Sequence, residues 1–154
     1  TVRSAKIYAI YGDISDADFA EIKKFLINPV ESREAALCLI YEQTFSPEIS
    51  TDEIIQKAKE IREEKVSEFA TTLFNGVCQN KQKLDLRISA AAEKWSLDRI
   101  SRVSLSVLRL AAYEILYVGT EKQVAVNEAL ELARKYDDEK AVSFINGVLA
   151  GIIN

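Results

Sequence analysis

The sequence contains no histidine, and this absence narrows the chemistry open to the protein. Histidine is the commonest general base and the commonest metal ligand, and Ser–His or Cys–His nucleophile pairs cannot form without it. No glycine-rich phosphate loop of either standard spacing is present. The acidic pair Asp137–Asp138 falls between predicted helices, where a carboxylate caps the next helix. The sequence therefore predicts a protein that is not an enzyme and that holds no metal or other cofactor.

Helix breakers and cysteines are also scarce. Five glycines and two prolines among 154 residues favour long helices over a turn-rich β-sandwich. The only cysteines, Cys38 and Cys78, lie within apolar helical patterns, and we interpret both as small core residues rather than as a disulfide or metal pair. No apolar run approaches the roughly 18 residues that a membrane span needs, and no secretion leader is evident. We therefore expect a cytoplasmic protein that does not enter a membrane.

Positively charged residues are fewer than negatively charged ones, 20 Lys and Arg against 24 Asp and Glu. The formal net charge is −4 at pH 7, and a nucleic-acid-binding protein usually presents a basic field to the phosphates. The net charge argues mildly against nucleic-acid binding but leaves room for a local basic patch.

Two parts of the chain differ in pattern. Residues Arg3 to Tyr11 are rich in β-branched and aromatic side chains, which predicts a short strand, and a helix is predicted to follow it up to Asn28–Pro29. From Ser32 onward, apolar residues recur at helical spacing, with a capping box at Ser50–Glu53 and a helix-ending glycine at Gly119. We predict an N-terminal extension over residues 1–31 and an all-α domain over residues 32–154.

Several charged residues and glycines interrupt the apolar faces of the predicted helices. Arg109 and Glu114 lie in a nearly all-hydrophobic helix, either as a solvated stripe or internal polar clamp, or because one of them orders a binding surface. Gly76 and Gly147 occur in similar Asn-Gly sequences inside helices, and we interpret both as sites of close helix approach, with functional backbone sites as the alternative.

Aromatic residues mostly follow core spacing, Trp95, Phe45 and Tyr41 among them. Phe144 is the exception, because it lies near Lys140, Arg134 and Lys135 at the start of the last helix. An aromatic ring beside cations is a workable platform for an unstacked base.

Four segments resemble the NusB family. They are SREAALCLIYE (32–42), WSLDRISRVSLSVLRLAAYEIL (95–116), QVAVNEALELARKY (123–136) and FINGVLAGI (144–152). Their order and spacing also match, and the resemblance covers residues 32–153. It implies an all-helical, NusB-like fold of two three-helix subdomains. Residues 1–34 resemble a short N-terminal piece of phosphoribosylformylglycinamidine synthase, which is too small to carry catalytic apparatus.

The NusB resemblance also implies a function and partners. Members act as transcription antitermination factors that bind boxA-type RNA together with a small-subunit ribosomal protein, NusE, on the RNA polymerase elongation complex. Carried over by position, Arg33, Lys140 and Phe144 would contact RNA, and Tyr41 and Asp98 would face NusE. Asp98 equally suits the N-terminus of the long helix, where it would act as a cap.

One departure from the family lowers the expected RNA affinity. Members carry an arginine-rich segment before the first helix, whereas this chain reads NPVESREAA (28–36), in which only Arg33 is basic.

An alternative function is a NusB-like structural or assembly module with weak or no RNA binding. A lone strand near the N-terminus has unpaired edges, so pairing with the same strand of another copy would give a homodimer through residues 1–30.

Overall fold

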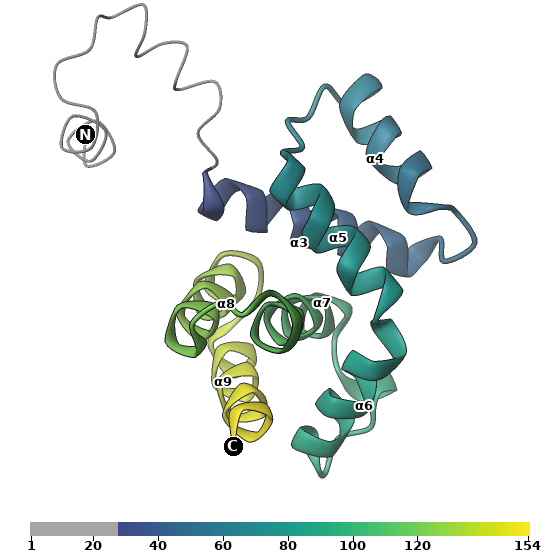
Figure 1. Ribbon diagram of the computed structural model, residues 1–154. Helices are drawn as coiled ribbons and strands as arrows, with labels where there is room; N and C mark the ends of the chain where they lie inside the picture. The colour runs from purple at the N-terminus through teal and green to yellow at the C-terminus, as the bar shows by residue number, and fades with distance from the viewer. Residues whose placement is uncertain (1–27) are drawn as a thin grey trace, which may run out of the picture.

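The computed structural model describes residues 28–154, and within this range every regular element is helical (Figure 1). The predicted strand and helix before Asn28, and the segment resembling the purine enzyme, lie outside the described residues. The elements in chain order are α3 (Pro29–Phe45), α4 (Thr51–Glu60), α5 (Glu68–Gln79), α6 (Lys81–Ala92), the 3₁₀-helix η1 (Leu97–Arg99), α7 (Arg102–Tyr113), the π-helix η2 (Glu114–Val118), α8 (Lys122–Tyr136) and α9 (Glu139–Ile153).

The helices form two units that share one core. Helices α3, α4 and α5 make the first unit, and α7, α8 and α9 make the second, with α6 packed against α7 and α9 (Figure 1). Helix α7 also packs against α3 and α5, so that it joins the two units. The predicted all-α, NusB-like fold is confirmed, and α6 is an addition to the expected three helices of the second unit. The largest fully buried side chains of the core include Phe74, Leu39, Leu73, Leu84, Ile88, Leu108, Leu110, Ile145 and Leu149.

Side-chain caps fix where several helices begin. The Ser50 hydroxyl accepts a hydrogen bond from the Glu53 amide at 3.2 Å, as the capping box predicts. Asp138 caps α9 by accepting from the Ala141 amide at 2.8 Å, and Gly119 ends η2 with a left-handed φ of 81°. These three sequence predictions are confirmed.

Other helix ends differ from the sequence prediction. Helix α3 begins at Pro29, three residues before Ser32, because Asn28 caps it and proline suits the first helical position. Ser101 caps α7 by accepting from the Ser104 amide at 3.1 Å, and residues 97–99 form a separate 3₁₀ turn. The expectation that Asp98 caps the long helix is therefore wrong.

The two Asn-Gly glycines have different surroundings. A Cβ at Gly76 would lie 2.0 Å from the Tyr113 ring, so Gly76 is the close-approach glycine that the sequence predicted. A Cβ at Gly147 would meet nothing within 4 Å, so the packing interpretation of Gly147 is wrong.

Exposure also differs from expectation at several apolar positions. Cys38 is exposed and Cys78 is half-buried, and both thiols are free, so the core assignment fails for Cys38. Trp95 and Phe45 are exposed as well, although core spacing predicted that both are buried. No helix among residues 28–154 is long and apolar enough to cross a membrane.

Candidate nucleic-acid and partner interfaces

Arg33 is a buried structural cation. It lies in the second turn of α3 and donates to both carboxylate oxygens of Glu114, at 2.8–3.0 Å, across the junction between α3 and η2. Thr120 donates to the same carboxylate at 3.1 Å. The side chains of Arg33 and Glu114 are 8% and 2% exposed, and the hydrogen bond to Glu114 raises the pKa of Arg33. Glu114 is therefore half of an internal clamp.

This burial bears on the predicted RNA patch. Arg33 is buried and its guanidinium is engaged with Glu114, whereas Lys140 is exposed. The structure thus argues against a direct phosphate contact by Arg33 and does not bring all three predicted RNA residues onto one exposed surface.

Arg109 is a second internal clamp. It makes a two-pronged hydrogen bond to Asp85 at 2.8 and 3.0 Å, which ties α7 to α6. The interpretation of Arg109 as a polar clamp is confirmed.

Phe144 and Lys140 lie one turn apart near the start of α9. Lys140 is exposed, and Phe144 is half-buried against the core. The Phe144 ring meets Trp95 edge to face, with centroids 6.0 Å apart. Trp95 is 49% exposed, so that about half of its surface is open to solvent beside Phe144. Sequence spacing missed Trp95, because the short segment that it occupies is not helical.

The neighbouring cations that the sequence placed near Phe144 are already paired. Arg134 forms an ion pair with Glu131 on the same helix, and Lys135 forms one with Glu34 of α3. Tyr136 also donates to Glu34, and the Lys135 hydrogen bond is the main reason that the pKa of Glu34 is lowered. These contacts fasten the end of α8 to α3 and leave Lys140 as the cation one turn from Phe144.

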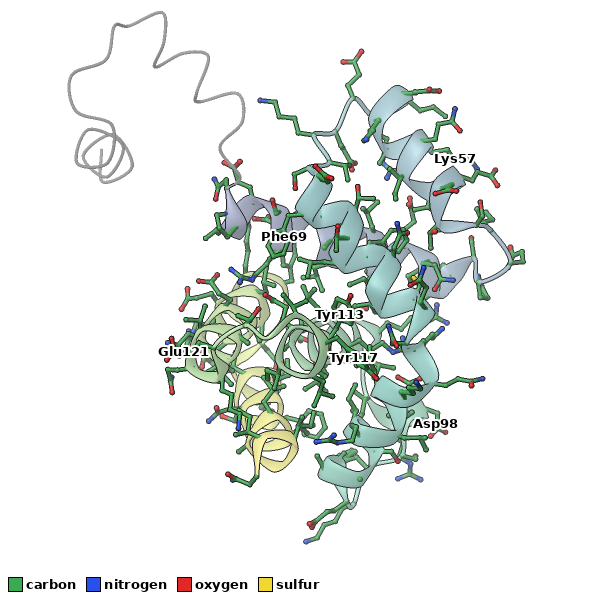
Figure 2. All side chains as sticks on the ribbon, viewed as in Figure 1. Lys57, Phe69, Asp98, Tyr113, Tyr117 and Glu121 are labelled. Atoms are coloured by element: carbon green, nitrogen blue, oxygen red, sulfur yellow. The ribbon has the colours of Figure 1, made fainter. Side chains whose placement is uncertain are left out.

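Tyr41 belongs to an exposed aromatic–cation cluster. It lies edge to face with Phe45, at 5.0 Å between centroids, and the Arg102 guanidinium lies 4.2 Å over the Phe45 ring. Arg102 also donates to the Thr44 carbonyl at 3.4 Å, which brings the start of α7 to the end of α3. Asp98 is exposed on η1, four residues before Arg102 (Figure 2). The contact between Phe45 and Arg102 could not be predicted from sequence, because it joins residues far apart in the chain.

The described residues define a class of protein. Residues 28–154 contain no group of three or more His, Cys, Asp and Glu side chains that could hold a metal ion. What they present instead is a helical scaffold held by internal ion pairs, with exposed aromatic rings beside cations. Exposed aromatic rings beside cations on a helical scaffold are typical of proteins that bind macromolecules.

Comparisons with known proteins give the family. The NusB family model matches residues 30–154. The transcription antitermination protein NusB of Listeria monocytogenes is 41% identical over 123 residues, covering 79% of this chain and 93% of the relative. NusB of Clostridium botulinum is 34% identical, covering 82% and 100%. This chain belongs to the NusB family, and it is therefore not an enzyme.

Solved structures agree. NusB of T. maritima superposes with a TM-score of 0.72 at 29% identity, covering 82% of this chain and 92% of that one. A crystal structure of the antitermination factors NusB and NusE in complex with double-stranded RNA matches with a TM-score of 0.71 at 26% identity, covering 80% and 93%.

Proposed function

We propose that this protein is a transcription antitermination factor that binds boxA-type RNA together with the small-subunit ribosomal protein NusE. The observation that carries the proposal is the exposed Trp95–Phe144 pair with Lys140 one turn away, within a chain of the NusB family. Stacking on aromatic rings and neutralisation of phosphates by cations are the two contacts that single-stranded RNA requires.

The exposed cluster of Tyr41, Phe45 and Arg102 supports the protein-partner part of the proposal. Aromatic and arginine side chains dominate the binding energy of protein interfaces. Asp98 is free of a capping role at α7 and adds a negative charge four residues before Arg102 of this cluster. We assign Tyr41 and Asp98 to the NusE-facing surface.

Three further features belong to the proposal. The protein acts on the RNA polymerase elongation complex in the cytoplasm, as its function requires. RNA affinity is low without NusE, because the arginine-rich segment before the first family helix is missing. A homodimer through residues 1–30 remains a prediction from sequence.

The test is an RNA-binding measurement on the full chain, with and without the ribosomal protein. Fluorescence anisotropy of a labelled boxA RNA should show binding that tightens when NusE is added. Phe144→Leu keeps apolar bulk but removes the ring, so it should weaken RNA binding about tenfold. Phe69→Leu is the matched control, since Phe69 is another half-buried phenylalanine, under Arg33. Equal RNA affinity of Phe144→Leu and the unsubstituted chain would remove Phe144 from the site, and no RNA binding even with NusE would refute the function.

Partner binding is tested separately. Asp98→Lys should weaken NusE binding with little change in the melting temperature, because Asp98 is exposed and caps no helix. Glu121→Lys makes the same charge change on the far side of the molecule (Figure 2) and should leave NusE binding unchanged. Similar NusE affinities for both variants would refute the assignment of Asp98.

A further inference from the structure

Positive charge is concentrated around α6. Residues 81–94 contain four Lys or Arg and two Asp or Glu, a net charge of +2 in a chain whose net charge is −4. One of the two acids, Asp85, is paired with Arg109. The rest of the protein is therefore acidic, and the surface around α6 is the place where a polyanion meets least repulsion.

Two of the three cations of α6, Lys83 and Arg87, lie on its α9 side. Arg87 donates to the Ile152 carbonyl at 3.1 Å, and Ala91 lies 3.1 Å from the position of a Cβ on Gly151. With Trp95 against Phe144, these contacts show that α6 and α9 run antiparallel along a shared seam. At 100° per residue, Lys83 lies on the same flank of α6 as Arg87, whereas Asp85 lies on the opposite flank, toward α7. Lys94 lies two residues after the end of α6 and immediately precedes Trp95 in the sequence.

The α9 side of the seam is uncharged beyond its first turn. Lys140, Phe144, Gly147 and Gly151 lie within about 60° of one another around α9 and form one row. From Ala141 to Asn154 the chain has no charged residue, and Glu139 lies about 100° around the helix from Lys140, outside the row. Nothing acidic on α9 therefore opposes a polyanion along this row.

Gly147 is the unexplained member of the row. A glycine inside a helix costs about 1 kcal/mol relative to alanine, and at Gly76 the close approach of Tyr113 accounts for it. At Gly147 no neighbour is near, and the residue is exposed. A glycine that packing does not require lets something outside the protein approach the helix backbone.

We propose that a single strand of RNA runs along the α6/α9 seam, from Lys140 and the Trp95–Phe144 pair over Gly147 to Arg87. One base stacks on Trp95, the backbone crosses α9 at Gly147, and Lys94, Lys83 and Arg87 neutralise phosphates. From Phe144 to Ile152, where Arg87 is anchored, the path spans about 12 Å. This inference rests on the proposed RNA-binding function and extends it from one stacking site to a continuous path.

The sharpest test places a negative charge on the path without disturbing the fold. Gly147→Glu fits because the space above Gly147 is open, and Asn146→Glu adds the same charge to the same helix, one residue away and about 100° around. The probe is a labelled single-stranded boxA RNA, with the full chain and saturating NusE. We expect Gly147→Glu to weaken binding about tenfold and Asn146→Glu less than twofold.

Two more variants examine the ends of the path. Trp95→Ala should weaken RNA binding about tenfold through lost stacking. Arg87→Gln should flatten the dependence of log affinity on log salt concentration by about 0.7, the value for one phosphate contact on a single strand. Lys59→Gln on α4 is the control, and its salt slope should equal that of the unsubstituted chain.

The outcomes separate this inference from the function on which it rests. If the unsubstituted chain binds RNA and Gly147→Glu binds equally well, the path is wrong and the function stands. Equal weakening by Gly147→Glu and Asn146→Glu would show a general charge effect and would also overturn the path. If the unsubstituted chain with NusE does not bind the RNA, the proposed function itself fails.

Discussion

Burial decides how much each charged residue of this protein contributes to the stability of the fold. The Arg33–Glu114 pair is almost fully buried, whereas the Lys57–Glu53 pair on α4 has side chains that are about half exposed. Water and salt screen the exposed pair, so that it adds little to stability. In the buried pair, loss of one partner leaves the other charge without compensation.

Removing one partner of the buried pair should therefore be costly. Arg33→Met or Glu114→Leu alone should lower the free energy of unfolding by about 3–5 kcal/mol, since each leaves an unpaired charge in the core. The double variant should lose clearly less than the sum of the two. Urea unfolding measures all three, with Lys57→Ala as the control, which should change stability by less than about 1 kcal/mol. Additive losses in the double variant would show that the two side chains do not stabilise each other.

Sequence reasoning reached the wrong role for Arg33 for a physical reason. Arg33 is the lone basic residue at the start of the first family helix, and its partner Glu114 lies 81 residues away. Patterns within one helix report neighbours three or four residues apart and carry no information on such pairs. Because Glu114 interrupts an apolar helix, the sequence indicates that its carboxylate has a polar partner. The sequence does not indicate which residue that partner is.

At the scale of helices, the same Gly→Ala substitution in the two Asn-Gly sequences allows a direct comparison of stability. Gly76→Ala should destabilise the protein by about 1–3 kcal/mol, because its Cβ would overlap the Tyr113 ring. Gly147→Ala should stabilise it by up to about 1 kcal/mol, because alanine favours the helix and the space is open. Thermal unfolding of both variants shows the signs directly. A loss of stability in Gly147→Ala would mean that the glycine serves packing after all.

Helix starts were more predictable than exposure. Ser50 and Asp138 were found from sequence, because a cap is a local interaction between residues three apart. The exposure of Trp95 and Phe45 was not found, because apolar spacing does not distinguish a core side chain from one at the rim of the core. Both candidate binding surfaces contain such aromatic residues at the rim of the core. The fold could therefore be predicted from sequence more completely than the candidate sites.

At the scale of the whole molecule, α7 makes the two helical units interdependent. It packs against α3 and α5 on one side and against α6, α8 and α9 on the other, and the Arg33–Glu114 pair closes the same junction. The hydrophobic core of residues 28–154 is one cluster that begins with Ala36. Because Asn28 supplies the cap of α3, a chain that starts there keeps every contact described for the fold.

A chain that starts at Asn28 can therefore be used to test the predicted homodimer. The β-branched and aromatic residues among residues 3–11 predict a strand whose edges pair with the same strand of a second copy, most simply antiparallel about a two-fold axis. Deleting residues 1–27 should then convert a dimer into a monomer with an unchanged helical circular dichroism spectrum. Light scattering at high micromolar concentration measures both masses. The prediction fails if the full chain is already monomeric there, and a shortened chain that stays dimeric would place the contact on the helical domain.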